Sequence, residues 1–309
     1  MPSEFALIDR YFRRPTRHTR LGVGDDGAIV RPMPGMELVV STDMLVSGTH
    51  FLADADPENL GWKTLAVNVS DMAAMGAQPR WALLAAALPA ATESWISRFA
   101  TGFFACAETF GVDVIGGDTT RGPRNFCVTI FGEVPEGRAL LRSGARPGDE
   151  IWVSGAPGRA ALGLAHLQGR HVLPEPAEYL AALHRPQPRV ALGLALRGLA
   201  TAAIDVSDGL LADLGHILEA SEVSASLGIP DLPAPGIERD CRLAGGDDYE
   251  LVFTAPAARK PEVEALVGAL GLALTRIGRV ETGAPPRLTL VDADGRAVAI
   301  GQRGYDHFG

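Results

Sequence analysis

The sequence predicts a mixed α/β (α+β) protein with two domains. Apolar runs of strand length alternate with longer stretches in which apolar residues recur at helical spacing, in both halves of the 309-residue chain. Hydrophobic residues make up 47% and charged residues 21%, which suits a chain with a sizeable core and not a disordered one. A stretch rich in Gly and Arg at 136–148 separates the halves. We therefore expect domains at 1–137 and 148–309.

The first element is expected to be a short helix. Ser3 can cap it, and its apolar residues Phe5, Ile8 and Phe12 recur at helical spacing. A turn rich in Gly and Asp follows at 22–27. The chain should then enter its first strands.

Start and stop signals define the remaining elements. Pro57 stands at the first position of a helix, and Gly111 ends the next one. The first half should hold strands at 28–31, 37–41, 81–88, 112–115 and 126–134 and helices at 56–76 and 92–110. The second half should hold strands at 151–154, 203–206, 249–254, 273–280, 287–291 and 296–300, and helices at 158–168, 177–184, 189–199, 210–220 and 261–270. Three prolines in 230–242 predict a loop there.

The charge balance and composition exclude several classes of function. With 28 basic and 37 acidic residues, the net charge is −9, so we expect no nucleic-acid partner. The two lysines, Lys63 and Lys260, do not follow a glycine, which excludes a Walker A loop. The longest apolar stretch, 81–88, is too short to span a membrane, and no signal peptide is recognisable. Three widely spaced cysteines fit a reducing compartment, so we expect a cytoplasmic protein with no membrane partner.

Aspartates gather beside glycine or hydroxyl residues at the ends of apolar runs. They are Asp25 and Asp26 in GVGDDGA, Asp43 in STDML, Asp71 in NVSDM, Asp118 in GGDTT, Asp205 and Asp208 in AIDVSDG, and Asp247 and Asp248 in GGDDYE. Carboxylates at strand ends project into the crevice above a sheet. Converging carboxylates repel one another unless cations neutralise them, and Mg²⁺ prefers such oxygen ligands. Each aspartate alone could instead be a turn former or a helix cap, as Asp208 before Gly209 illustrates.

Other residues favour a phosphate ligand. Gly116 and Gly117 allow the backbone to approach a ligand closely. Arg142 could bind phosphate oxygens in a bidentate manner, or be a solvated surface charge. His50, seven residues after Asp43, could contact a metal or substrate, or be a hydrogen-bonded structural histidine. The sequence has no H-E-x-x-H motif and no G-x-S-x-G motif, which argues against a zinc site and a serine nucleophile.

Taken together, the motifs resemble the thiamine-monophosphate kinase family of the PurM-like (aminoimidazole-ribonucleotide-synthetase-like) superfamily. Matching blocks run in order along nearly the whole chain: EFALIDRYF, GVGDDGA, STDMLVSGTHF, NVSDMAAMGAQP, GGDTTRGP, RSGARPGDEIWVSG, RPQPR, AIDVSDGL, GGDDYEL and GYDHF. The resemblance implies two α/β domains, the N-terminal sheet forming a barrel across a homodimer. It also implies ATP-dependent phosphorylation of thiamine monophosphate to thiamine diphosphate, the last step of thiamine diphosphate biosynthesis, with several Mg²⁺ ions per site.

The resemblance also implies residue roles. The implied metal ligands are Asp26, Ser41, Thr42, Asp43, Asp71, Asp118, Asp205 and Asp208. The implied ATP contacts are Gly117, Asp118, Arg142 and Ser207, and the implied substrate contacts are His50, Asp247 and Tyr305. The family usually carries Glu where this chain has Asp247, which is one methylene shorter. Its substrate contact could therefore run through water, or pass to Asp248 or Glu250.

The implied chemistry needs no strong base, because the acceptor is itself a phosphate anion. The obstacle is repulsion between two polyanions, and positioning with electrostatic stabilisation is the usual solution. Because no residue stands out as a nucleophile, we expect direct in-line transfer without a phosphoenzyme. Two alternatives remain open: another PurM-like ATP-dependent synthetase, and a non-catalytic sensor of ATP and Mg²⁺.

Overall fold

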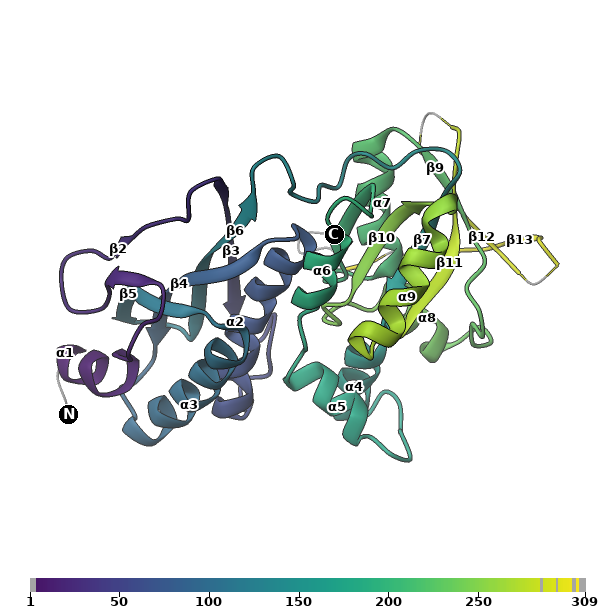
Figure 1. The fold of residues 1–309 in the computed structure, drawn as a ribbon. Helices are drawn as coiled ribbons and strands as arrows, with labels where there is room; N and C mark the ends of the chain where they lie inside the picture. Colours follow the sequence, from purple (N-terminus) through teal and green to yellow (C-terminus); the bar gives the residue numbers. More distant parts are fainter. Residues whose placement is uncertain (1–3, 284–285, 293, 302–303, 306–309) are drawn as a thin grey trace. The chain divides into compact units, whose positions relative to one another are not determined.

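The computed structural model describes residues 4–283, 286–292, 294–301 and 304–305 of the chain. It contains two compact units, which are described separately below (Figure 1). Unit 1 comprises residues 1–72 and 77–137, and unit 2 comprises residues 73–76 and 138–309. The expected helix cap at Ser3 lies outside the described residues.

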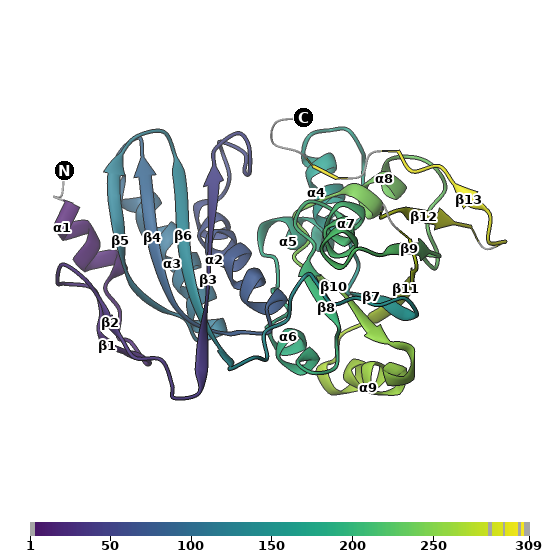
Figure 2. The same cartoon turned by 90° about the horizontal axis from the view of Figure 1, so that it is seen from above.

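Unit 1 is built on a four-stranded mixed sheet with two helices on one face (Figure 2). In order across the sheet, the strands are β3 (Met36–Val46), β6 (Asn125–Pro135), β4 (Gln78–Leu88) and β5 (Asp113–Arg121). Strand β6 is antiparallel to β3 and to β4, whereas β4 and β5 are parallel. The covering helices are α2 (Pro57–Ala74) and α3 (Glu93–Phe110). Phe99 of α3 stacks on Phe126 of β6 with ring centroids 4.5 Å apart, in the core between helix and sheet.

The opposite face of this sheet is largely uncovered at its β3 edge. Side chains alternate between the two faces of a strand, and on β3 the outward set includes Leu38, Val40 and Met44. These three side chains are 44%, 55% and 51% exposed, respectively. A row of exposed aliphatic side chains on a strand is uncommon in a monomer and suits a surface that is covered by a partner.

The N-terminal segment adds short elements to unit 1. Helix α1 (Glu4–Leu7) continues into a π-helical turn, η1 (Ile8–Phe12), which agrees with the helix predicted from the spacing of apolar residues. Strands β1 (Thr19–Leu21) and β2 (Ile29–Val30) then form a two-stranded sheet around the predicted turn. The sequence did not predict β1, because three residues carry too little alternation to be recognised.

Unit 2 contains a seven-stranded sheet. In order, its strands are β13 (Ala297–Val298), β12 (Leu288–Val291), β9 (Ser224–Leu227), β11 (Leu274–Glu281), β7 (Asp149–Ser154), β10 (Leu251–Pro256) and β8 (Ala202–Asp205). All neighbours are antiparallel except β12 and β9. The helices are α4 (Arg159–Leu167), α5 (Ala177–His184), α6 (Val190–Leu196), α7 (Leu210–Ser221), α8 (Ile237–Ala244) and α9 (Lys260–Leu270), with a 3₁₀ turn η2 (Ala257–Arg259).

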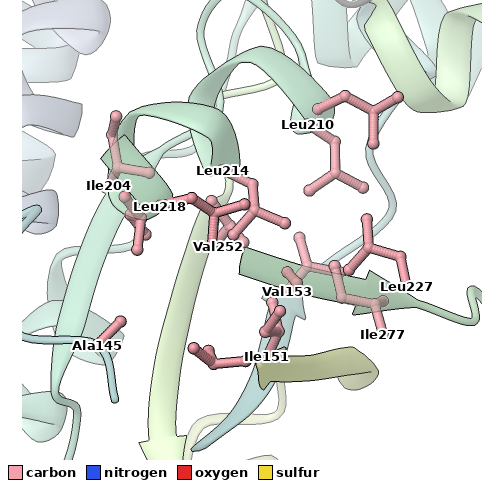
Figure 3. Packing of buried hydrophobic residues seen from close by; sticks show 14 of the residues in the cluster. Ala145, Ile151, Val153, Ile204, Leu210, Leu214, Leu218, Leu227, Val252 and Ile277 are labelled. Atoms are coloured by element: carbon pink, nitrogen blue, oxygen red, sulfur yellow. The ribbon is translucent and has the colours of Figure 1, made fainter. Parts of the chain in front are cut away.

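The core of unit 2 lies between this sheet and α7. Figure 3 shows Ile151 and Val153 of β7 and Val252 of β10 facing Leu214 and Leu218 of α7. All five side chains are buried. Figure 2 shows α7 on one side of the sheet and α6 and α9 on the other. Among the described residues, no helix is long and apolar enough to cross a membrane.

Two features of unit 2 differ from the sequence prediction. The loop predicted over 230–242 is wrong in its second part, where α8 forms a helix. The prolines end at Pro235, and Gly236 precedes a segment that buries Leu243 and carries four charged residues, which suits a surface helix. Strand β9 was not predicted, because the short sequence SASL has little strand character and forms a strand through its pairing with β11.

Candidate functional site

A cavity of about 1020 Å³ in unit 1 brings together several residues that the sequence singled out. Its lining includes Asp25, Asp26, Gly117 and Asp118, beside apolar side chains such as Trp81. The volume is typical of sites for small molecules, as is the combination of apolar walls with a few polar groups. The cavity therefore places carboxylates beside an apolar wall, an arrangement that suits a ligand with both apolar and charged parts.

A segment that we call the strap, residues 17–33, carries Asp25 and Asp26. Both ends of the strap are held by buried carboxylates of the sheet. Asp113 of β5 accepts a hydrogen bond from the backbone N–H of Arg17 at 2.8 Å, and Glu133 of β6 accepts one from Met33 at 2.6 Å. Charged acceptors make such bonds stronger than bonds between neutral groups. The sheet thus fixes the two ends of the segment that contributes the acidic pair to the cavity.

Gly117 occupies a position on β5 that admits no side chain. Its φ is +149°, and an added Cβ would lie only 1.8 Å from the carbonyl oxygen of Leu84 on the neighbouring strand. Glycine is therefore required beside Asp118 for the strand to keep this shape. The close approach of two backbones thus accounts for the second glycine of the Gly116-Gly117 pair.

A second polar group in unit 1 links β3 to α2. The Ser41 hydroxyl donates to a carboxylate oxygen of Asp71 at 2.5 Å, and the backbone N–H of Asp43 donates to the Asn68 side chain at 3.0 Å. Thr42 lies between Ser41 and Asp43 on the strand, so its side chain points to the other face. Its hydroxyl donates to the Val128 carbonyl at 2.9 Å. Any contribution of Thr42 to a metal site shared with its neighbours would therefore involve its backbone.

His50 is held in the turn that follows β3. Its ring nitrogen Nδ1 accepts a hydrogen bond from the backbone N–H of Val46 at 3.0 Å. The backbone N–H of His50 donates to the Val46 carbonyl at 2.9 Å. In the neutral ring an accepting Nδ1 places the proton on Nε2. The structural hydrogen bond and a ligand contact are thus compatible, because they use different nitrogens.

Unit 2 gathers five predicted residues at or around the loop at 206–209, which joins β8 to α7. The loop contains Ser207 and Asp208. The backbone N–H of Asp247 donates to the Ser207 carbonyl at 2.9 Å, and that of Tyr305 donates to the Asp208 carbonyl at 3.0 Å. Asp205, at the end of β8, is buried. Residues distant in sequence are therefore joined here by direct backbone hydrogen bonds.

Sequence reasoning missed Asp213, which organises this loop. Its carboxylate accepts hydrogen bonds from the backbone N–H groups of Ser207, Asp208 and Gly209 at 3.0, 3.1 and 3.0 Å. Burial, together with the nearby charge of Asp208, raises the pKa of Asp213 to about 7, although its hydrogen bonds from the three backbone N–H groups act to lower the pKa. An acid in the first turn of the expected helix was the available signal, since such acids often bind free N–H groups.

The other acids of the GGDDYE motif have structural partners. Asp248 accepts hydrogen bonds from the backbone N–H groups of Gly158 and Ala160, at the start of α4. Glu250 accepts from the Arg189 guanidinium, with Nε to Oε2 at 2.7 Å, and from the hydroxyl of Ser154. Both acids are buried. Because both carboxylates already have hydrogen-bond partners within the protein, we do not expect either of them to replace Asp247 as a substrate contact.

Asp247 itself is half-buried and takes an unusual backbone conformation. Its φ is +72°, in the left-handed region, and its carboxylate accepts a hydrogen bond from the hydroxyl of Tyr249 at 3.1 Å. Arg142, by contrast, is exposed, and its backbone carbonyl accepts a hydrogen bond from Ser221. An exposed guanidinium agrees with either interpretation given above, a phosphate contact or a solvated charge.

The donor set fits a hard divalent cation. The candidate ligands are carboxylate and hydroxyl oxygens, which Mg²⁺ prefers, and they include the Ser41–Asp71 pair. Among the residues that the structure describes, no three Asp, Glu, His or Cys side chains already converge as a metal site. Mg²⁺ commonly binds through one or two carboxylates plus phosphate oxygens and water, so a site completed by the nucleotide agrees with both observations.

Comparison with known proteins identifies relatives over the whole chain. Residues 24–134 match the family model of the AIR synthase related protein N-terminal domain, and residues 146–291 match its C-terminal domain. Thiamine-monophosphate kinases of Salmonella typhimurium and Escherichia coli K12 are each 46% identical to this chain, covering 99% of it and 98% of the relative. The thiamine-monophosphate kinase of Bacillus subtilis is 35% identical and covers 99% of both chains.

Solved structures give the same relationship. The thiamine-monophosphate kinase of Stenotrophomonas maltophilia superimposes with a TM-score of 0.84 at 46% identity, covering 96% of this chain and 98% of that one. A structure of AaThiL complexed with AMPPCP and TMP gives a TM-score of 0.75 at 32% identity, covering 98% and 97%. The hydrogenase maturation protein HypE shares the fold at 22% identity, with a TM-score of 0.77.

Proposed function

The chain belongs to the thiamine-monophosphate kinase family, and we propose that it transfers the γ-phosphoryl group of ATP to thiamine monophosphate. The products are thiamine diphosphate and ADP. The observation that carries the proposal is full-length similarity at 46% identity, over a chain that retains the acids of each site motif. A relative of known structure binds AMPPCP and TMP together, which supports the same pair of ligands here.

We assign the metal ligands to oxygens from both units. They are Asp26, Ser41, Thr42, Asp43, Asp71 and Asp118 in unit 1 and Asp205 and Asp208 in unit 2. When bound, Mg²⁺ would neutralise the phosphates of donor and acceptor, whose repulsion otherwise opposes the reaction. The backbones that carry these side chains are held by hydrogen bonds to buried acids within each unit, as at the strap and the loop at 206–209, and fixed donors of this kind favour electrostatic stabilisation.

The remaining residues bind and orient the two substrates. Gly117 lets the backbone approach the nucleotide, while Ser207 and Arg142 offer a hydroxyl and a guanidinium to its phosphates. His50 can donate from Nε2 to the substrate. Asp247 and Tyr305 complete the substrate contacts, with Asp247 reaching less far than the family's usual Glu. The acceptor phosphate supplies the attacking oxygen, so the protein needs no nucleophile of its own, and transfer is in line between the two substrates.

We also propose that the protein is a cytoplasmic homodimer without nucleic-acid or membrane partners. The exposed aliphatic row of β3 would be covered by the same sheet of a second copy, closing a barrel, so that residues 1–137 serve dimerisation as well as metal and ATP binding. The three cysteines, Cys106, Cys127 and Cys241, are unpaired with one another, which suits a reducing compartment.

The decisive experiment is incubation of the purified protein with ATP, Mg²⁺ and thiamine monophosphate, followed by chromatography for thiamine diphosphate. We expect product that depends on all three, and its loss when EDTA removes the cation. Binding of ATP without any product would favour the non-catalytic sensor. Turnover of ATP that requires a purine precursor instead would favour another PurM-like synthetase.

A second experiment tests direct transfer. After incubation with γ-³²P-ATP, the protein is precipitated and examined for label that withstands washing. We expect all label in thiamine diphosphate and none on the protein. A labelled protein that passes its phosphate to added thiamine monophosphate would overturn direct transfer while leaving the overall reaction intact.

A further inference from the structure

We infer that Asp213 is a positioning residue that couples the nucleotide-binding loop of unit 2 to the two segments that contact thiamine monophosphate. The inference rests on the proposed function, because that function assigns roles to Ser207, Asp208, Asp247 and Tyr305. Asp213 itself would touch neither substrate. Its part is to fix one backbone loop on which all four of these residues depend.

The first observation is the set of hydrogen bonds to the Asp213 carboxylate. One oxygen, Oδ2, accepts from three consecutive backbone N–H groups, those of residues 207, 208 and 209. Asp213 is only 2% exposed, so water cannot replace these bonds cheaply. A buried carboxylate with three donors is a strong constraint, because leaving any of the four groups unpaired costs the desolvation of that group.

The second observation is what the same loop does with its carbonyl groups. The Ser207 carbonyl accepts from the N–H of Asp247, and the Asp208 carbonyl accepts from the N–H of Tyr305. The N–H groups of the loop therefore bind Asp213, while its carbonyl groups bind the two segments that carry Asp247 and Tyr305. Because hydrogen bonds through one peptide group reinforce each other, ordering at one side supports ordering at the other.

The third observation is that glycines bring the two segments against the loop. Gly246 precedes Asp247, and an added Cβ on it would lie 2.3 Å from the Ser207 carbonyl oxygen. Gly304 precedes Tyr305, and its Cβ would lie 3.0 Å from the Asp208 carbonyl oxygen. Neither segment has room for a side chain, so any displacement of the loop must be transmitted to both.

The test compares two buried aspartates that both accept a backbone N–H. The variant is Asp213→Asn, in which the amide cannot offer the same negative acceptor to three N–H groups. The control is Asp149→Asn. Asp149 is buried, accepts from the N–H of Arg146 at 2.9 Å, and pairs with Pro256 at the end of β10 remote from the loop. Both variants should lose thermal stability, and only the first should alter substrate binding.

The discriminating readout is the split between KM and kcat. For Asp213→Asn we expect KM to rise about tenfold for both ATP and thiamine monophosphate. A purely structural loss lowers the amount of active enzyme, and hence the apparent kcat, while leaving both KM values unchanged. For the control Asp149→Asn we expect a lower apparent kcat and unchanged KM values. Unchanged KM values in Asp213→Asn, or a rise for ATP alone, would overturn the coupling.

Hydrogen exchange of the wild-type protein provides a test that needs neither a folded variant nor turnover. The amide hydrogens of residues 207–209, Asp247 and Tyr305 should exchange slowly and with a common opening free energy. Fast exchange at 207–209, or independent exchange of the three segments, would contradict the inference. If the wild-type protein forms no thiamine diphosphate, the proposed function fails, while this measurement still decides whether Asp213 holds the segments together.

Discussion

Buried carboxylates that accept backbone N–H groups recur where a site segment meets the core. Asp113 holds the strap, Asp213 holds the loop at 206–209, and Asp248 holds the start of α4. Each carboxylate is buried. At such positions the geometry of a loop is set by a buried acid that has few alternative partners, so the site segments are held by side chains that never need to touch a ligand.

The first prediction at this scale concerns Asp118. In Asp118→Asn the cavity keeps its shape but loses a charge, so we expect kcat/KM to fall by at least about 100-fold. Because Asp118 is exposed, the melting temperature should change little. The control is Glu108→Gln, an exposed acid on α3, which should retain full activity. Near-normal turnover of Asp118→Asn would remove this residue from the metal ligands.

The second prediction concerns pH and Asp248. Burial, reinforced by the charges of Glu250 and Asp247, raises the pKa of Asp248 from 3.8 to about 7, although its bonds from Gly158 and Ala160 act to lower it. Between these values the folded protein holds a proton that the unfolded chain has lost. The free energy of unfolding therefore falls as the pH rises through this window.

Asp248→Asn cannot titrate, so this part of the pH dependence should disappear. Urea unfolding at about pH 5 and about pH 8 should give a smaller loss of stability with rising pH in the variant than in the wild-type protein. The variant should also be less stable overall, because an amide cannot accept from both N–H groups. Asp294→Asn, at an exposed turn, should leave the pH dependence unchanged. An equal pH dependence in Asp248→Asn and wild type would contradict the raised pKa.

At the scale of elements, the packing of α2 on α3 depends on two glycines. An added Cβ on Gly61 of α2 would lie 2.0 Å from the Phe99 carbonyl oxygen, and one on Gly102 of α3 would lie 1.8 Å from the Glu58 carbonyl oxygen. The helix backbones thus touch at the crossing. Helix α2 also carries Asp71, which accepts the hydrogen bond from Ser41 of β3.

Gly102→Ala should therefore destabilise unit 1 although alanine favours helices. We expect a loss of about 1–3 kcal/mol in the free energy of unfolding, measured in urea, because the added methyl group meets backbone that cannot move aside. The matched control is Gly268→Ala on α9, where an added Cβ meets nothing within 4 Å. That variant should be more stable by about 0.5–1 kcal/mol. Equal effects of the two substitutions would refute the close crossing.

At the scale of the whole molecule, the proposed metal ligands account for part of the net charge of −9. Each unit carries part of a set of acids assigned to cations, so the protein with bound Mg²⁺ should be less anionic than its composition suggests. Unit 1 also presents an aliphatic row on β3, whose side chains are about half exposed in the part of the chain that the structure describes. Both features support the proposal made above, in which the active form includes bound cations and a second copy of the chain.

The prediction at this scale is that Val40→Asp prevents dimerisation. Val40 is 55% exposed on β3, and a carboxylate there would be buried without a partner in a two-sheet interface. Light scattering after gel filtration should give the mass of two chains for the wild-type protein and of one chain for the variant. Val172→Asp, at a 78% exposed position of unit 2, should remain dimeric. A monomeric wild-type protein, or a dimeric Val40→Asp, would contradict this interface.

Much of the fold could be predicted from the sequence, because long periodic segments dominate it. The helices predicted over 56–76 and 92–110 and the strand predicted over 81–88 are confirmed as Pro57–Ala74, Glu93–Phe110 and Gln78–Leu88, since the helices carry start or stop signals and the strand is a continuous apolar run. Short elements were missed for the opposite reason. Strand β9 has only four residues, and it acquires its conformation from the strands beside it.

The sequence by itself determined the family, the mixed α/β class and the set of acids, because motifs and periodicity are local properties of the chain. The tertiary structure decided which backbone N–H groups each buried acid binds. Only folding places Asp213 under the loop at 206–209, and only the packing of α2 on the sheet brings Asp71 to Ser41 of β3. Hydrogen-bond partners distant in sequence leave no local signal, since their choice depends on burial and register.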